Sequence, residues 1–145
     1  MNDLVLDTNA LRLLLQNIYV DRILASKDEI FVCKKWRKES GGIKELQLGF
    51  NIFSESLKKL MKKNKFHEKS AGGTALPQSL KKALEEHGAD EVDLDVASIA
   101  YNRSISGQVI FLVSDDHPFE RAQPLFEKYN INFERRKVEL NRMGL

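Results

Sequence analysis

The chain has 145 residues, of which 42% are hydrophobic and 30% are charged, and its formal net charge is +2. This length and composition fit one globular domain over residues 1–145. The sequence contains no run of 18 apolar residues, which excludes a membrane-spanning helix, and its single cysteine excludes an internal disulfide or a cysteine-built zinc site. The first ten residues lack the basic and apolar regions of a secretory signal, so we expect a soluble cytoplasmic protein.

The charges are unevenly distributed along the chain. Residues 1–82 carry 16 Lys and Arg against 9 Asp and Glu, whereas residues 83–128 carry 3 against 10. A basic surface beside an acidic cluster is typical of an enzyme that binds a polyanion on the basic surface and a metal ion in the acidic cluster. Random scatter of solvated charges would give the same totals, so the placement of the acids is more informative.

Hydrophobic periodicity predicts the strands and helices of the first half of the chain. A short apolar strand is expected at residues 3–6, and a helical repeat follows it over 10–24. A second buried strand is expected at 30–33, whereas the charged segment 34–50 is hard to place and begins with a piece that we interpret as helical. Residues 51–66 predict an amphipathic helix. Its expected apolar side holds Ile52, Phe53, Leu57, Leu60 and Met61.

The second half alternates helices with strands. After a glycine-containing loop, proline and glycine punctuation predicts where the helices begin and end. Strands that alternate with helices indicate parallel βαβ units. The fold class is therefore predicted as a three-layer α/β/α sandwich with a central, mostly parallel sheet of four to five strands. The expected elements are a loop at 69–75, helices at 77–88 and 90–104, a strand at 108–114, a helix at 118–129 and a last strand beginning near 130.

Carboxylates follow two of the expected strands directly. Asp7 comes after the first strand, and Asp115 and Asp116 come after the strand at 108–114. Ligand sites of parallel sheets lie beyond the carboxyl ends of the strands, so these acids are expected to meet there. Converging carboxylates repel one another unless a cation lies between them, and hard oxygen ligands suit Mg²⁺ or Mn²⁺. Aspartate is also common in turns and helix caps, and that interpretation stays open for each acid alone.

The helix expected at 90–104 supplies a further acid. At about 100° per residue, Asp93 lies within roughly 60° of the centre of the apolar face, whereas Asp95 points more than about 90° away. An acid near the core at a helix N-terminus needs a partner, which is either a metal ion or the helix amides. Asp93 is therefore the candidate that joins the other two acids, or else a first-turn residue that stabilises the helix dipole.

Three segments together resemble the motifs of PIN domains. LVLDTNAL is similar to their first motif, DLDVASIA at 93–100 is similar to the third, and VSDDHPF at 113–119 resembles the last. The order and spacing agree over nearly the whole chain. The last motif places Asp116 in the ligand position, with Asp115 beside it.

The resemblance implies metal-dependent hydrolysis of phosphodiester bonds, usually in RNA. It implies that Asp7, Asp93 and Asp116 bind Mg²⁺ or Mn²⁺ as catalytic ligands. A fourth acid is expected after the second strand, for which Glu39 is the best match; Glu45 is an alternative, and Glu39 as a plain surface residue is another. Residues expected to orient the acids or the attacking water are Thr8, Asn9, Ser114 and Asp115.

Two basic segments are candidates for contact with RNA. Residues 58–69 contain six lysines, which could hold a phosphate backbone or form an ordinary solvated helix face. A second group flanks Glu39 and is expected nearer the acids. The candidates are Lys34, Lys35, Arg37, Lys38, Lys62, Lys63 and Lys65.

Two alternatives keep the same fold. The first is a PIN-like module that binds RNA or acts as a scaffold and cleaves weakly or not at all. The second is a toxin ribonuclease held by a small antitoxin protein. Homodimers are also common in the family that the chain resembles.

Overall fold

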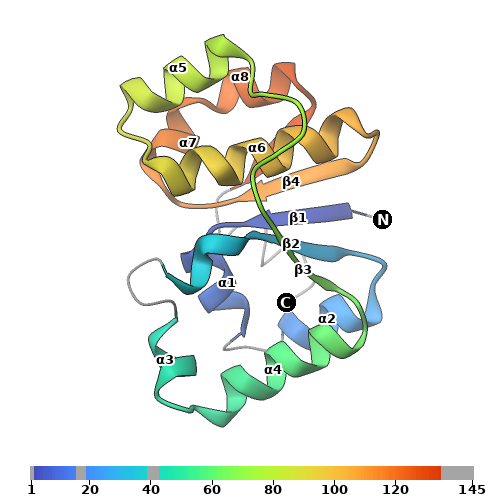
Figure 1. Ribbon diagram of the computed structural model, residues 1–145. Coiled ribbons are helices and arrows are strands. Elements are labelled where there is room, and N and C mark those ends of the chain that lie inside the picture. The colour runs from blue at the N-terminus through green and yellow to red at the C-terminus, as the bar shows by residue number, and fades with distance from the viewer. Residues whose placement is uncertain (1, 16–18, 39–42, 135–145) are drawn as a thin grey trace.

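The computed structural model describes residues 2–15, 19–38 and 43–134. Its five described strands form one all-parallel sheet in the order β3-β2-β1-β4-β5 (Figure 1). The predicted three-layer α/β/α class is thus confirmed. The strands are β1 (Asn2–Leu6), β2 (Glu29–Cys33), β3 (Phe66–Lys69), β4 (Val109–Val113) and β5 (Ile131–Glu134).

Helices cover both faces of this sheet (Figure 1). One face is covered by α1 (Thr8–Leu15), α2 (Tyr19–Ala25) and α4 (Asn51–Lys62), with the short α3 (Lys44–Gln47) beside them. The other face is covered by α5 (Gln78–Glu86), α6 (Glu91–Ile105), α7 (His117–Arg121) and α8 (Gln123–Lys128). None of the described helices is both long and apolar enough to cross a membrane.

The central strands are apolar because both of their faces are buried. In β1, Leu4 and Leu6 pack into the core under α1 and α4, whereas Val5 packs into the core under α6. Strands covered on both sides read as continuous apolar runs, as β1, β2 and β4 do. In the register, Leu6 lies opposite Val32 of β2 and Val113 of β4, so the three strands end side by side at one edge.

Several boundaries differ from those expected. The predicted helix over 51–66 ends at Lys62, and Phe66 begins β3, a polar edge strand that periodicity did not indicate. Residues 34–37 form a 3₁₀ helix, η1 (Lys34–Arg37), rather than a longer helix. The helix expected at 118–129 is divided into α7 and α8 at Ala122.

The apolar side predicted for α4 is only partly correct. Phe53, Leu57 and Leu60 are buried, but Ile52 and Met61 are 58% and 48% exposed. A helix of period 3.6 that lies on a sheet buries a narrow stripe, and these two residues fall at its margins. Together with the exposed Leu48 and Phe50 they leave apolar surface around α3 and α4.

Candidate functional site: carboxylates at the sheet edge

The ends of β1 and β4 bring Asp7 and Asp116 to the same edge of the sheet. Asp7 follows Leu6 directly, and Ser114 follows Val113, the partner of Leu6 in the neighbouring strand. Ser114 Oγ donates a hydrogen bond to Oδ2 of Asp7. The same hydroxyl accepts a hydrogen bond of 2.9 Å from the backbone N–H of Asp116. One buried hydroxyl therefore joins the two acids.

Asp7 is the most perturbed of these carboxylates. Its side chain is enclosed at the start of α1, where the backbone N–H of Ala10 donates to Oδ1 at 2.8 Å. Burial raises the pKa of Asp7 from 3.8 to about 7 despite the hydrogen bonds from Ser114 and Ala10, which lower it, and the charge of Asp116 raises it further. The environment of Asp7 thus disfavours its ionised form, and the negative charge of Asp116 adds to this effect.

Asp116 occupies the N-cap position of α7 without capping it through its side chain among the described residues. Pro118 stands in the first turn of that helix, where its missing N–H costs nothing. The carboxylate of Asp116 is half-buried and carries a charge that raises the pKa of Asp7 and of Asp93. Asp116 is therefore the acid that lies within electrostatic range of both others.

Asp93 is engaged in the cap of α6. Its backbone N–H donates to Oδ1 of Asp90 at 2.9 Å, and its Oδ2 accepts from the backbone N–H of Asp90 at 3.1 Å. This reciprocal arrangement is a capping box. Burial raises the pKa of Asp93 to about 6, opposed by the bond from the Asp90 backbone and reinforced by the charges of Asp90 and Asp116. Asp93 is thus close enough to Asp116 for their charges to interact, while its Oδ2 caps α6.

A divalent ion fits two of these carboxylates more readily than three. Among residues 2–15, 19–38 and 43–134, no group of three or more His, Cys, Asp or Glu side chains is placed to hold a metal ion. Mg²⁺ keeps several of its waters and is commonly bound by one or two carboxylates together with substrate phosphates. The oxygens of Asp7 and Asp116 suit that mode of binding, whereas Oδ2 of Asp93 already accepts a hydrogen bond in the cap of α6.

The other residues expected near the acids are spread over the same edge. Thr8 and Asn9 form the first turn of α1, half-buried and exposed respectively, and Asp115 is half-buried between Ser114 and Asp116. Glu39 lies outside the described residues. The alternative fourth acid, Glu45 of α3, accepts a hydrogen bond of 2.6 Å from Nε of Arg12, which lowers its pKa.

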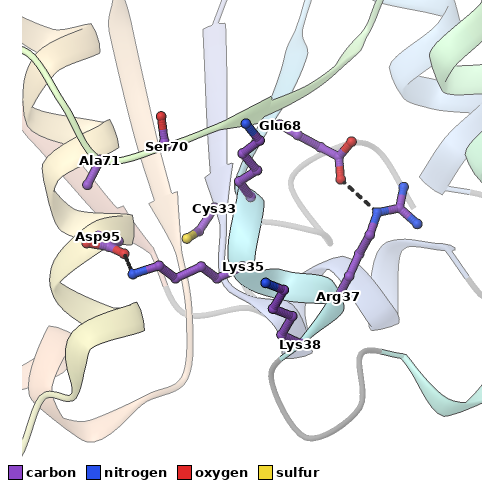
Figure 2. Close-up of a pocket in the computed structure, with 9 residues that line it drawn as sticks. Cys33, Lys35, Arg37, Lys38, Glu68, Ser70, Ala71 and Asp95 are labelled. Atoms are coloured by element: carbon purple, nitrogen blue, oxygen red, sulfur yellow. Dashed lines mark hydrogen bonds and ion pairs between the residues drawn. The ribbon is translucent and has the colours of Figure 1, made fainter.

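A pocket of about 580 Å³ opens between the end of β2 and α6 (Figure 2). Four of the predicted RNA-binding residues line it, and Figure 2 shows Lys35 reaching to Asp95 on α6 while Arg37 turns to Glu68 on β3. The sequence did not indicate that Glu68, Ser70 and Ala71 line this pocket, because β3 was not predicted and the position of the loop expected at 69–75 depends on that strand. The lining residues are Cys33, Lys34, Lys35, Arg37, Lys38, Glu68, Ser70, Ala71 and Asp95.

The three other predicted RNA-binding residues lie away from the acids. Lys62 is the last residue of α4 and Lys63 is its C-cap, and both precede β3. They therefore lie at the amino edge of the parallel sheet, the edge that does not carry Asp7. Lys65 Nζ donates to the backbone carbonyl oxygens of Ser26 and Asp28 at 2.6 and 3.1 Å. The structure therefore does not bring these lysines together with the carboxylates.

No model of a known protein family and no curated protein matches this chain. The chemistry assigned to the sheet edge accordingly rests on its own residues.

Proposed function

We propose that the protein is a ribonuclease that uses Mg²⁺ or Mn²⁺ bound at Asp7 and Asp116. The observation that carries this proposal is the convergence of a buried Asp7, whose pKa is about 7, with a second carboxylate at the carboxyl edge of the sheet. Within the described part of the chain, neither acid forms an ion pair with a Lys, Arg or His. A cation from solution would supply the missing positive charge.

The physical argument is electrostatic. A buried carboxylate beside a like charge is costly when ionised. A divalent cation reverses this cost, because it favours the ionised form of both acids and lowers the pKa of Asp7. A bound ion of this kind lowers the pKa of a coordinated water and neutralises charge on a phosphate.

The surrounding residues have distinct roles in this proposal. Ser114 and the Ala10 N–H hold the Asp7 carboxylate in one orientation from two sides. Asp93 adds negative charge next to Asp116. The basic wall of the neighbouring pocket holds the polyanionic strand at the edge where the acids lie.

A second candidate is a module that binds RNA without cutting it. Two observations favour it: Asp93 takes part in the capping box of α6, and no three potential ligands are placed to hold a metal ion among the described residues. The two candidates share the basic pocket and differ in the consequence of adding metal.

Cleavage of single-stranded and structured RNA distinguishes them. The wild-type chain is incubated with each RNA in Mn²⁺, in Mg²⁺ and in EDTA, beside Asp7→Asn, Asp116→Asn and the exposed control Asp21→Asn of α2. The proposal predicts metal-dependent cleavage that both site variants lower by at least about a hundredfold, equivalent to roughly 3 kcal/mol. Unchanged cleavage in both site variants contradicts the proposal, whereas binding without cleavage in any metal supports the second candidate.

A further inference from the structure

The pocket in Figure 2 lies at the end of β2, which pairs with the strand that leads into Asp7. Cys33, which lines it, follows Val32, and Val32 lies opposite Leu6 in the register of β1 and β2. Cys33 and Asp7 are therefore the next pair of residues along two strands that run about 4.8 Å apart. Asp95 of the opposite wall lies on α6, the helix that also carries Asp93, although side chains two residues apart on a helix point in different directions. A ligand in the pocket would therefore lie next to the strand end that carries Asp7.

Two of the four cations that line the pocket are already paired with carboxylates. Lys35 of η1 bridges to α6, with Nζ 2.7 Å from Oδ2 of Asp95 and a second contact to Glu91. These contacts span 56 and 60 residues of chain, and they connect the end of β2 to the start of α6. Lys35 thus forms a wall of the pocket rather than a free phosphate ligand.

The second paired cation is Arg37, which is held by Glu68 of β3. Oε1 of Glu68 accepts from Arg37 Nε at 3.0 Å and from the indole N–H of Trp36 at 2.7 Å. The guanidinium also lies 4.5 Å from the centre of the ring of Trp36, which is buried. Arg37 is therefore fixed through Nε, and a guanidinium fixed in this way keeps terminal N–H groups that can donate to phosphate oxygens.

The remaining cations are Lys34 and Lys38. Both side chains are exposed at the pocket, and across the described ranges neither pairs with a carboxylate. A phosphate that enters the pocket meets these two ammonium groups without having to break an existing ion pair. The small residues Ser70 and Ala71 leave the opposite side of the pocket open to a bulkier group.

We infer that this pocket binds one unpaired nucleotide of the strand that the carboxylates act on, with Lys34 and Lys38 contacting its phosphates. The inference rests on the proposed function for the identity of the strand. A volume of about 580 Å³ lies in the range of roughly 300–1,000 Å³ found for pockets that enclose a small organic ligand, and one nucleotide is of that size. A nucleotide inside a duplex would first have to leave its stack, which costs a few kcal/mol, so the pocket selects single strands.

The first test measures binding of a fluorescent single-stranded RNA in EDTA. Lys34→Ala/Lys38→Ala is compared with Lys62→Ala/Lys63→Ala, which removes the same charge from the opposite edge of the sheet. We expect the pocket pair to weaken binding by tenfold or more and the control pair by less than about twofold. The pocket variant should also lower the slope of log K against log salt by roughly 1.4, since each single-strand phosphate contact contributes about 0.7. Equal losses in the two variants, or no loss in the pocket variant, would overturn the inference.

The second test fills the pocket without changing its charge. Ala71→Trp is compared with Ala75→Trp, an exposed residue farther along the same loop that does not line the pocket. We expect at least a fivefold loss of single-strand binding for the first variant only, and we expect a duplex of the same sequence to compete poorly. Unchanged binding in Ala71→Trp, or equal competition by the duplex, contradicts the nucleotide pocket. Because EDTA removes divalent ions, selective binding by a chain that never cleaves would contradict the proposed function alone.

Discussion

Ser114 Oγ donates its hydrogen to Oδ2 of Asp7, joining the ends of two neighbouring parallel strands through a hydroxyl that has no exposed surface. The same oxygen accepts from the backbone N–H of Asp116. The serine thereby sets the orientation of one carboxylate and the backbone position of the other. The geometry of the acid pair depends on this residue.

Ser114→Ala should raise the pKa of Asp7 above its value of about 7, because the hydrogen bond from Ser114 is the strongest influence that lowers it. The loss of a buried hydrogen-bond partner should also reduce the free energy of unfolding by about 1–3 kcal/mol. Titration of the side-chain carboxyl signals by ¹³C NMR measures the first effect. Ser56→Ala, which alters a buried serine of α4, is the control and should leave the Asp7 titration unchanged. An unaltered Asp7 titration in Ser114→Ala would contradict the role given to the serine.

Asp7 should make the fold less stable as the pH rises. The pKa of Asp7 is about 7 in the folded chain, against an ordinary value of 3.8. Between these values the folded state binds more protons than the unfolded state, so the contribution of Asp7 to stability is full below about pH 4 and is lost as the pH rises to about 7. The difference corresponds to roughly 4 kcal/mol. In urea unfolding without divalent ions, Asp7→Asn should remove this decline and be more stable than the wild type at pH 8.

The same measurement has a matched control and a clear contrary result. Asp21→Asn changes an exposed acid of α2 and should retain the wild-type dependence on pH. If the free energy of unfolding changed equally with pH between pH 4 and 7 in the wild type and in Asp7→Asn, Asp7 would not titrate as its burial indicates.

Asp90 and Asp93 share one cap but should differ in function. Asp90→Ala removes the side chain that accepts from the Asp93 N–H, which should lower the free energy of unfolding by about 0.5–2 kcal/mol. Asp93→Asn keeps an oxygen that can accept from the Asp90 N–H, so its stability should change less, whereas the loss of charge beside Asp116 should lower metal-dependent cleavage by at least tenfold. Thermal unfolding and cleavage rates of both variants test this separation. Equal cleavage by Asp93→Asn and the wild type would show that Asp93 caps α6 but has no role in cleavage.

The buried Asp3 forms an ion pair with the half-buried Arg103 near the amino edge of the sheet. Asp3 has no exposed surface and accepts from Arg103 Nε at 2.7 Å, while its Oδ1 has no partner among the described residues. The guanidinium of Arg103 also lies 4.4 Å from the centre of the Phe31 ring. Arg103→Met should destabilise the fold by about 3–5 kcal/mol, because it leaves a buried charge unpaired.

Adding Asp3→Val to Arg103→Met tests the cause of that loss. The double variant removes both charges, so urea unfolding should show it to be more stable than Arg103→Met alone. A double variant that is less stable than Arg103→Met would contradict this account of the pair.

The sequence was sufficient to predict the layers of the fold and most of its buried strands. Continuous apolar runs such as those of β1 and β4 have one interpretation in a chain that alternates strands with helices. The edge strand β3 was missed because FHEK carries one buried residue and three polar or charged ones, so it lacks the period of a half-buried strand. What makes it a strand is its pairing with β2, which is a tertiary contact.

The same strand also determines where Lys65 lies. Once β3 pairs in parallel with β2, residues that precede it must lie at the amino edge, which takes Lys65 away from Asp7. Asp7 and Asp116 could be predicted because the carboxyl ends of parallel strands coincide. The capping box of Asp93 and the bridge from Lys35 to Asp95 could not, since each depends on which side-chain rotamer finds a partner.

Titration of Mn²⁺ into the chain by isothermal calorimetry at pH 7.5 tests the central claim, the divalent-ion site at Asp7 and Asp116, most directly. The wild type should bind with release of protons, since the metal lowers the pKa of Asp7 from about 7. Asp116→Asn should weaken binding by at least tenfold, and Asp21→Asn should bind as the wild type does. Equal Mn²⁺ affinity in the wild type and Asp116→Asn, with no proton release in either, would contradict the site.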